Sequence, residues 1–311
     1  MSIPFSAALC SLPDWAVLRV QGSDAATFLH SQLSTDFKRL SATQGRLGAY
    51  CNPQGRMLAS FIGVLAAPEE IWLACPADVL PSVQKRLSMF VLRAKVTLQA
   101  ASDVSVMGWV SPTGAAAPQD LATIWASQGP TAGQNDGVAV RLPDALGQTR
   151  GLWLTRTPHT PEAQTLDPAL WAWLEVHSGV APVTAATSGL FVPQMLNYDQ
   201  VGGVDFKKGC YPGQEIVART HYLGKVKRHA YVIEAENPLH VGQPLFSSED
   251  AAQPAGQIVR LAADPEHSGR IAAIAEIKSA ATEGGSLHLD HGAGLKVRLV
   301  EPQPRPHQPQ A

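Results

Sequence analysis

The 311-residue sequence contains only four cysteines, and no two of them are close enough in the chain to suggest a metal or cluster site. They are Cys10, Cys51, Cys75 and Cys210, and none belongs to a CxxC pair. This spacing argues against a disulfide framework and against a closed zinc or iron–sulfur site built from the chain's own cysteines. It predicts a protein of the reducing cytoplasm.

Other signals are also missing. No apolar run approaches the roughly 20 residues that a membrane span needs, and the first residues lack the basic region of a signal peptide. The sequence has no P-loop and no GxGxxG, which argues against the common nucleotide fingerprints. With 45% apolar and 16% charged residues, it is typical of a soluble protein of about two domains, with no membrane partner.

We expect no metal site. The pair His288-x-x-His291 has a spacing that could hold a metal, but the sequence offers no third ligand near it. Structural zinc sites use four ligands, so this pair is better explained as part of a glycine-bounded hairpin.

One stretch stands out by its charge. Residues 207–228 carry six positive side chains and one negative side chain, in a chain whose formal net charge is -2. A local excess of this kind predicts an anionic partner. The cations are Lys207, Lys208, Arg219, Lys225, Lys227 and Arg228, and the anion is Glu215.

Cys210 lies in this stretch, between Gly209 and Gly213. Residues 214–219 predict the start of a helix, so Cys210 is expected on a loop just before a helix N-terminus and beside two lysines. Both features favour a thiolate. The alternative is that Cys210 is a small buried hydrophobe, as many free cysteines are.

At these residues the chain resembles a known family. The motif Lys208-Gly209-Cys210-Tyr211-x-Gly213-Gln214-Glu215, followed by Arg219, is similar to the signature of the YgfZ family of folate-binding proteins. That family is related to the glycine-cleavage T-protein and supports the assembly or repair of iron–sulfur clusters. Further similar segments, spread over residues 22–228, are 22–36, 50–56, 91–96 and 191–194.

The resemblance implies an α+β, T-protein-like (aminomethyltransferase-like) fold with a C-terminal antiparallel β-barrel. We expect residues 1–228 to form a folate-binding region of two α+β subdomains, one of them inserted around residues 45–140. The short strands between Gly and Pro turns over 229–301 predict the barrel. The Pro- and Gln-rich residues 302–311 predict a disordered tail.

Local patterns predict individual elements. They are a strand from Trp15, a helix from Ala25 capped by Asp24, a turn over 52–56, a helix over 81–90 with Phe90 on its inner face, and a helix over 168–179 ended by Gly179.

The resemblance also implies roles for individual residues. Cys210 would be a redox-active or metal- or sulfur-contacting thiolate, with Lys208 and Arg219 as its electrostatic support. Tetrahydrofolate joins a flat pterin to an aromatic ring and an anionic tail, so it needs an apolar slot and a few polar groups. Trp15 and Trp171 would form walls of that slot, and the residues expected to contact the ligand are Tyr211, Gln214 and Glu215.

Each of these assignments has a plainer alternative. A single tryptophan is normally a core residue, and we expect that of Trp72, Trp109, Trp125 and Trp153. Trp173 should face another side of its helix than Trp171. Glu215 could simply favour the first helical turn electrostatically.

One departure from the T-protein pattern decides between two functions. T-proteins carry an acidic pair after the strand that contains the counterpart of Tyr50, whereas residues 55–61 here contain no carboxylate. We therefore expect a tetrahydrofolate-binding accessory protein for the assembly or repair of iron–sulfur client enzymes, with tRNA-modifying enzymes among them. The alternative is a folate-dependent one-carbon (aminomethyl or methyl) transferase.

A third hypothesis is that the basic residues 225–229 bind tRNA or another polyanion directly. The sequence pI of about 6.5 and the lack of a longer basic stripe disfavour it.

Overall fold

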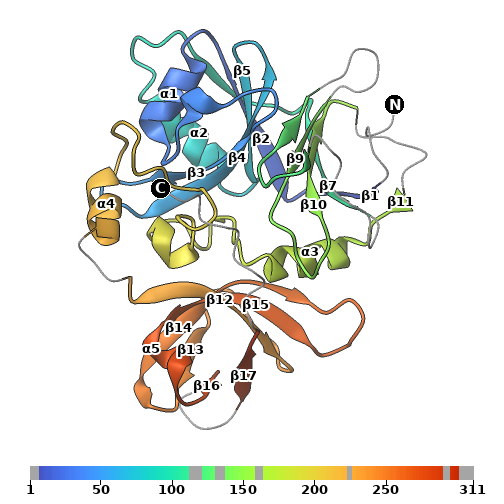
Figure 1. Ribbon diagram of the computed structural model, residues 1–311, viewed down its shortest axis with the longest axis vertical. Coiled ribbons are helices and arrows are strands. Elements are labelled where there is room, and N and C mark those ends of the chain that lie inside the picture. The colour runs from blue at the N-terminus through green and yellow to red at the C-terminus, as the bar shows by residue number, and fades with distance from the viewer. Residues whose placement is uncertain are drawn as a thin grey trace.

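The structure is a computed structural model that describes residues 7–111, 121–129, 137–157, 164–222, 226–289 and 295–300. Two β-sheets lie side by side, and a closed β-barrel packs beneath them (Figure 1). Helix α3 (Pro168–His177) separates the second sheet from the barrel and contacts strands of both. The α+β class and the C-terminal antiparallel barrel are therefore confirmed.

The first sheet is antiparallel and five-stranded. In spatial order its strands are β3 (Arg46–Cys51), β4 (Met57–Ala67), β5 (Glu70–Pro76), β2 (Trp15–Gln21) and β6 (Thr97–Ala100). Helices α1 (Ala25–Gln32) and α2 (Leu80–Ser88) cover one face. Because successive side chains of a strand alternate between faces, Leu18 and Val20 pack under the helices, while Trp15 and Val17 point to the core shared with the second sheet.

The second sheet has six strands. In spatial order they are β11 (Gln164–Thr165), β1 (Ala8–Ser11), β7 (Ser105–Val110), β10 (Arg150–Thr155), β9 (Gly137–Arg141) and β8 (Ser127–Gln128). The sheet contributes Val106, Val140 and Leu152 to the large core that it shares with the first sheet. The space between the two sheets is therefore closed by apolar side chains from both.

The barrel is closed by six antiparallel strands. They are β12 (Arg228–Ala235), β15 (Ile271–Lys278), β14 (Asp250–Ala263), β13 (Pro244–Ser247), β16 (Leu287–His288) and β17 (Lys296–Leu299), with the short helix α5 (Ala280–Glu283) after β15. Its interior holds a separate apolar core that includes Ile233, Leu245 and Ile277. The predicted tail over 302–311 lies outside the described residues.

Helix α3 is buried almost all round because it lies between the second sheet and the barrel. Trp171 and Trp173 are both buried, although they point to different sides. Its end is as predicted: Gly179 follows the helix with a φ of +70°, a left-handed conformation that glycine adopts without strain. The other four tryptophans, which we assigned to the core, are buried as well.

Two local predictions are wrong. Asp24 precedes α1, but its carboxylate does not cap the helix; it accepts a hydrogen bond from the backbone N–H of Lys95 at 2.7 Å. Helix α2 ends at Ser88, so Phe90 leaves the helical face and is 43% exposed. The first difference arises because Lys95, the partner of Asp24, is distant in sequence. The second arises because Phe90 lies beyond the end of the helix.

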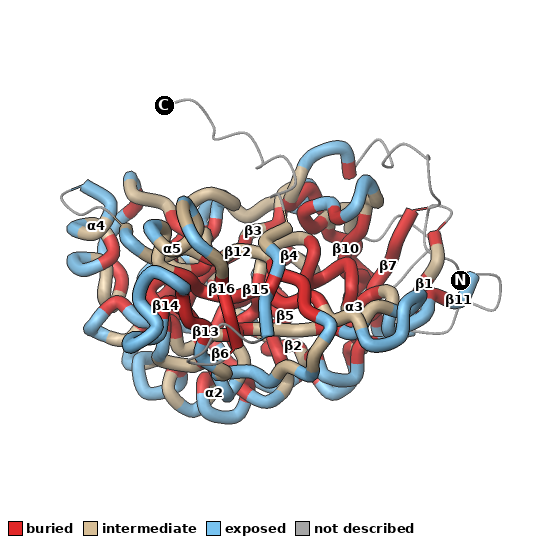
Figure 2. Tube along the Cα trace, turned by 90° about the horizontal axis from the view of Figure 1, so that it is seen from below, coloured by how far each residue is buried: buried red, intermediate tan, exposed pale blue. Residues whose placement is uncertain are grey.

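The surface of the molecule is formed largely by helices and loops. Figure 2 shows buried positions concentrated in the strands, and exposed positions along α2 and along α4 (Gln214–Tyr222). Of the helices in the described ranges, none has the length and apolar character that crossing a membrane requires.

Candidate functional site

Cys210 lies on the loop that leads into α4, as predicted, and its side chain is exposed. The three remaining cysteines are buried in the cores. Burial raises the pKa of the thiols of Cys10, Cys51 and Cys75 to about 12, which keeps them protonated and unreactive at neutral pH. Cys210 is thus the thiol that a partner or reagent in solution can reach.

Two glycines bring the cysteine motif against the turn over 52–56. Gly213 has a φ of +81°, and a Cβ placed on it would lie 2.3 Å from the carbonyl oxygen of Asn52 and 2.7 Å from the Cα of Gly55. Gly55 has a φ of +73°, and its own Cβ would lie 3.0 Å from the Cβ of Ile216. Two segments that resemble the family separately are therefore in direct backbone contact, which only glycine permits.

Lys208 anchors the motif to the end of α1. Its ammonium donates a hydrogen bond to the carbonyl oxygen of His30 and another, of 2.9 Å, to that of Leu33. It also lies 4.7 Å from the centre of the Tyr211 ring. Burial lowers the pKa of Lys208 to about 8, although the carboxylates of Asp36 and Asp205 oppose the shift. The lysine completes the C-terminus of α1, where carbonyl groups lack partners within the helix.

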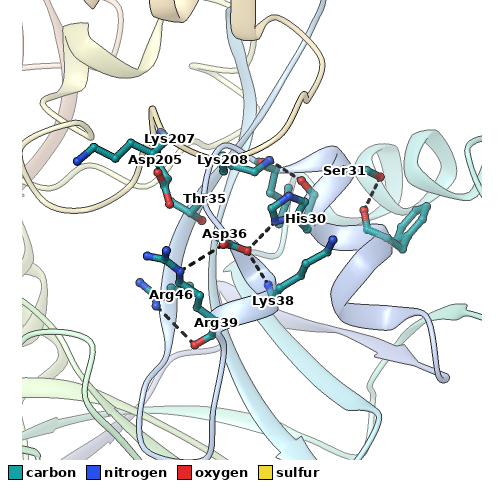
Figure 3. A network of polar contacts seen from close by, with 12 residues as sticks. His30, Ser31, Thr35, Asp36, Lys38, Arg39, Arg46, Asp205, Lys207 and Lys208 are labelled. Carbon is teal, nitrogen blue, oxygen red and sulfur yellow. Dashed lines mark hydrogen bonds and ion pairs between the residues drawn. The ribbon is translucent and has the colours of Figure 1, made fainter.

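His30 and Asp36 form a polar pair beside the motif (Figure 3). Nδ1 of His30 lies 2.6 Å from Oδ1 of Asp36, and Nε2 of His30 faces Gly209, 3.3 Å from the place that a Cβ there would occupy. Burial opposes ionisation of Asp36, but the hydrogen bonds from His30 and from the backbone of Lys38 lower its pKa overall. The figure also shows the side chains of Lys207 and Lys208 pointing in opposite directions.

The remaining motif residues occupy different surroundings. Tyr211 is buried, and burial raises the pKa of its phenol. The side-chain amide of Gln214 donates a hydrogen bond of 3.4 Å to the carbonyl of Lys208. Glu215 and Arg219 are exposed on α4, in its first and last turns. The structure thus brings Lys208, Tyr211 and Gln214 together around the loop of Cys210.

A second candidate region is a cavity of about 320 Å³ between the second sheet, the end of α3 and strand β12 of the barrel. We call it the outer cavity. Its polar lining residues are Arg141, Asp144, His177, Ser178, Asn197, Gln200 and Tyr231. Its volume falls at the lower end of the range of about 300–1,000 Å³ that is typical of small-molecule sites.

A smaller space of about 30 Å³, the inner cavity, adjoins the outer one, since Pro143 and Val180 line both. Trp15 lines it, as do Ser60, Arg150 and Glu175. It lies in the core between the two sheets, where the alternation of β2 directs Trp15. The two cavities are therefore neighbours, and Trp15 lines the inner one.

The two predicted slot tryptophans have different positions. Trp15 lines the inner cavity, whereas Trp171 lines neither cavity. Trp171 packs directly on Gly108, where a Cβ would lie 2.6 Å from its ring, and the guanidinium of Arg150 lies 5.1 Å from the ring centre. Trp171 therefore packs against Arg150, which lines the inner cavity, but does not itself line that cavity.

The cavities hold buried polar atoms without partners. Nη1 of Arg150 and Nε2 of His177 have no hydrogen-bond partner among the described residues. The carboxylate of Glu234 is 4.0 Å from Nε2 of His177. Burial lowers the pKa of Arg150 to about 10 and also lowers that of His177, which keeps this imidazole neutral. Such groups are rare in folded proteins unless a ligand or water completes them.

The chain is similar in sequence to proteins that carry a name. No protein-family model matches it. A "tRNA-modifying protein YgfZ" of Cronobacter sakazakii is 28% identical over 310 residues, which cover 95% of this chain and 92% of the relative. The protein of the same name from Yersinia pestis (strain Pestoides F) is 30% identical over 234 residues, which cover 72% of this chain and 69% of the relative.

The chain belongs to the YgfZ family. The resemblance noted in the motif around Cys210 is thereby confirmed. The crystal structure of the glycine cleavage system aminomethyltransferase T from Bartonella henselae matches with a TM-score of 0.72 at 16% identity, covering 96% of this chain and 86% of that one. This YgfZ chain therefore has the predicted T-protein-like fold.

Sequence reasoning missed several residues of this YgfZ chain's candidate regions. Arg150 and His177 line the cavities and carry buried polar atoms without partners among the described residues, as does Arg141, and no motif surrounds them. His177 ends a helix whose pattern indicated only packing. The His30–Asp36 pair spans a helix end, and its spacing of six residues is not a recognised motif. Of the two histidines in the His288-x-x-His291 sequence, for which we expected no metal, His291 lies outside the described residues. Nε2 of His288 lies 2.6 Å from Oγ of Ser286.

Proposed function

We propose that this chain binds tetrahydrofolate in the outer and inner cavities and acts as an accessory protein for iron–sulfur enzymes. The observation that carries the folate assignment is that Arg150 and His177, which line the two adjoining cavities, each carry a buried polar atom without a partner among the described residues. A bound ligand with hydrogen-bonding edges would satisfy both.

The residues present fit such a ligand. A flat pterin needs aromatic or apolar walls. Val180 lines both cavities, and Trp15 lines the inner one, whose volume of about 30 Å³ must widen before a ring can enter it. Its polar edge needs donors and acceptors, which Arg150 and His177 can provide. In the outer cavity, Asn197 and Gln200 offer amides to the remainder of the molecule.

The thiol of Cys210 would serve the client enzymes. Its exposure makes it reachable by another protein, whereas the outer cavity lies between the second sheet, the end of α3 and the barrel. Residues 194–210 run directly from the outer cavity, at Asn197 and Gln200, to Cys210. The relatives' name supports the proposal that the clients include enzymes that modify tRNA.

A one-carbon transferase is the weaker alternative. Of the described residues that line the two cavities, the carboxylates are Asp144 and Glu175. Asp144 is paired with Arg141 at 2.8 Å, and Glu175 is paired with Arg260. Each carboxylate is therefore already engaged by a guanidinium, so neither is free to contact a reacting group. Turnover of an aminomethyl donor by the purified protein would restore this alternative.

Calorimetric titration with tetrahydrofolate tests the ligand assignment. We expect saturable binding by the wild type and a loss of about tenfold or more in affinity for Trp15→Ala, because the pterin loses its aromatic wall. Gln200→Ala, a partly exposed position that does not endanger folding, should also bind more weakly. Cys210→Ala should bind like the wild type, because Cys210 lines neither cavity.

Absence of binding by the folded wild type would contradict the folate assignment. Equal affinity in the wild type, Trp15→Ala and Gln200→Ala would mean that folate binds elsewhere on the molecule.

The thiol assignment has its own test. In cells that lack the endogenous protein, we expect Cys210→Ala to leave the activities of dependent iron–sulfur enzymes unrestored, while Cys51→Ala, at a buried cysteine, restores them. The measurement is the activity of iron–sulfur enzymes, including those that modify tRNA, in extracts. Full restoration by Cys210→Ala would remove the thiol from the function.

A further inference from the structure

The surface at the end of α2 exposes apolar side chains for which the proposed function has no use. Met89 is 60% exposed, Phe90 is 43% exposed and Leu92 is 85% exposed. Single exposed apolar residues are common, but a run of three within four positions is not explained by the folded chain itself. We call Met89, Phe90 and Leu92 the α2 apolar run.

The backbone holds this run outward. After α2, the N–H groups of residues 89–92 donate to carbonyls close behind them: Met89 to Arg86, Phe90 to Leu87 and Leu92 to Phe90, at 3.0–3.3 Å. Meanwhile Val83 and Leu87, on the inner face of α2, are fully packed in the core. The outward position of the run is therefore part of the folded geometry.

A groove of about 390 Å³ lies beside the run, and Met89 belongs to both. Leu58, Val83 and Ser188 also line it. The segments that carry Leu58 and Ser188 are held together, because the Ser188 hydroxyl donates to the carbonyl of Leu58 at 2.9 Å and the N–H of Gly189 donates to that of Met57 at 2.7 Å. The groove is therefore preformed.

The charged residues among those that line the groove are both cations. Lys85 and Arg86 line it, Arg93 and Lys95 follow the run, and residues 79–95 contain no carboxylate. The nearest acid before them, Asp78, accepts a hydrogen bond from the N–H of Ala185 at 2.9 Å. The groove is therefore lined by apolar side chains, those of Leu58, Val83 and Met89, and by the cations Lys85 and Arg86.

We propose that this groove binds a short amphipathic segment of a partner protein, one that places apolar side chains against the α2 apolar run and carboxylates against Lys85 and Arg86. Grooves with an apolar floor and a charged rim bind such segments, and opposite charge fixes their orientation. A concave floor suits an inserted side chain better than the flat surface of a membrane or the backbone of a nucleic acid.

The chain's own ends do not match the groove. Residues 1–6 contain no carboxylate, and residues 301–311 contain one glutamate but no Leu, Ile, Val, Phe or Met. The proposal does not depend on folate binding or on Cys210, and its test is separate from theirs.

The test uses random short peptides displayed on phage and selected on the full chain. We expect the recovered peptides to combine large apolar residues with Asp or Glu. Their affinity, measured by fluorescence anisotropy, should fall about tenfold or more for the double variant Met89→Ser/Leu92→Ser and for Lys85→Glu. All three positions are at the surface, so folding is preserved. Val241→Ser, at a residue that is 39% exposed on the barrel, should bind like the wild type.

Recovery of no peptide above background, of peptides without carboxylates, or of peptides that bind the double variant as well as the wild type would overturn the proposal. Two further measurements address other occupants. Self-association in sedimentation velocity that the double variant abolishes would assign the groove to a second copy. Binding to phosphatidylcholine vesicles that contain phosphatidylglycerol, abolished in the same way, would assign it to a membrane surface, and either result would replace the partner segment.

Discussion

Gly213→Ala is expected to lower the free energy of unfolding by about 3 kcal/mol or more and to loosen the loop that carries Cys210. Two costs add together. A side chain at a φ of +81° costs about 1–2 kcal/mol. The added Cβ would also lie 2.3 Å from the carbonyl oxygen of Asn52, and overpacking of this kind costs about 1–3 kcal/mol. Because the obstacle is backbone, the loop must move.

Gly242→Ala is the matched control. Gly242 has a φ of +83°, but a Cβ there would have no atom within 4 Å. It should therefore show the conformational cost alone, about 1 kcal/mol. The difference between the two variants in urea unfolding measures the collision between the cysteine motif and the turn.

Thiol titration of the folded protein gives a second reading. In the wild type we expect one thiol, that of Cys210, to react rapidly with a thiol reagent, because the other three cysteines are buried. In Gly213→Ala we expect a second thiol to react rapidly, that of Cys51, which lies beside the displaced turn. If Gly213→Ala is no less stable than Gly242→Ala and shows one fast thiol, the two segments are not in the close contact described.

Lys208→Met is expected to lower the free energy of unfolding by about 2–3 kcal/mol at pH 7. The substitution keeps an apolar chain of similar length, but it leaves the carbonyl oxygens of His30 and Leu33 without the donor that reaches them in the wild type. Hydrogen bonds from a charged donor contribute about 1.5–3 kcal/mol each, and relief of the buried charge offsets part of that loss. Urea unfolding provides the measurement.

The effect of Lys208→Met should also depend on pH. The pKa of Lys208 is about 8 in the folded chain and has its ordinary value of 10.5 when unfolded. Between these values the unfolded chain holds a proton that the folded chain has released, so the stability of the wild type gains from this group as pH rises. The deficit of Lys208→Met relative to the wild type should therefore widen from pH 8 to pH 10.5.

Lys207→Met is the control for this prediction, because Lys207 is exposed. Substitutions at such positions usually change stability by no more than about 0.5 kcal/mol, and no widening with pH is expected. Equal stabilities of Lys208→Met and Lys207→Met would show that the ammonium of Lys208 does not hold the motif to α1.

Much of the fold could be predicted from the sequence because local patterns determine it. The alternation of β2, the helix after Gly213 and the glycine that ends α3 were each visible in a few neighbouring residues. The barrel followed from short strands at regular spacing. The errors at Asp24 and Phe90 arose where a partner from elsewhere, or the end of a helix, decided the outcome.

The candidate sites were less predictable. The motif around Cys210 was recognisable as a sequence, but nothing local indicates that Lys208 reaches α1. Trp15 and Trp171 were paired as walls of one slot, and the structure places Trp15 at a cavity and Trp171 behind Arg150. The unpaired atoms of Arg150 and His177 could not be foreseen, because burial without a partner is a property of the packed chain.

By itself, then, the sequence determined the family, the succession of strands and helices, and the motif that carries Cys210, since these depend on residues close together in the chain. Only the tertiary structure decided which distant segments meet. In the folded chain Gly213 contacts Gly55, Trp15 lines the inner cavity, and the apolar residues at the end of α2 are exposed. The physical reason is that contact between remote segments depends on how whole sheets and helices pack, and no short pattern encodes that packing.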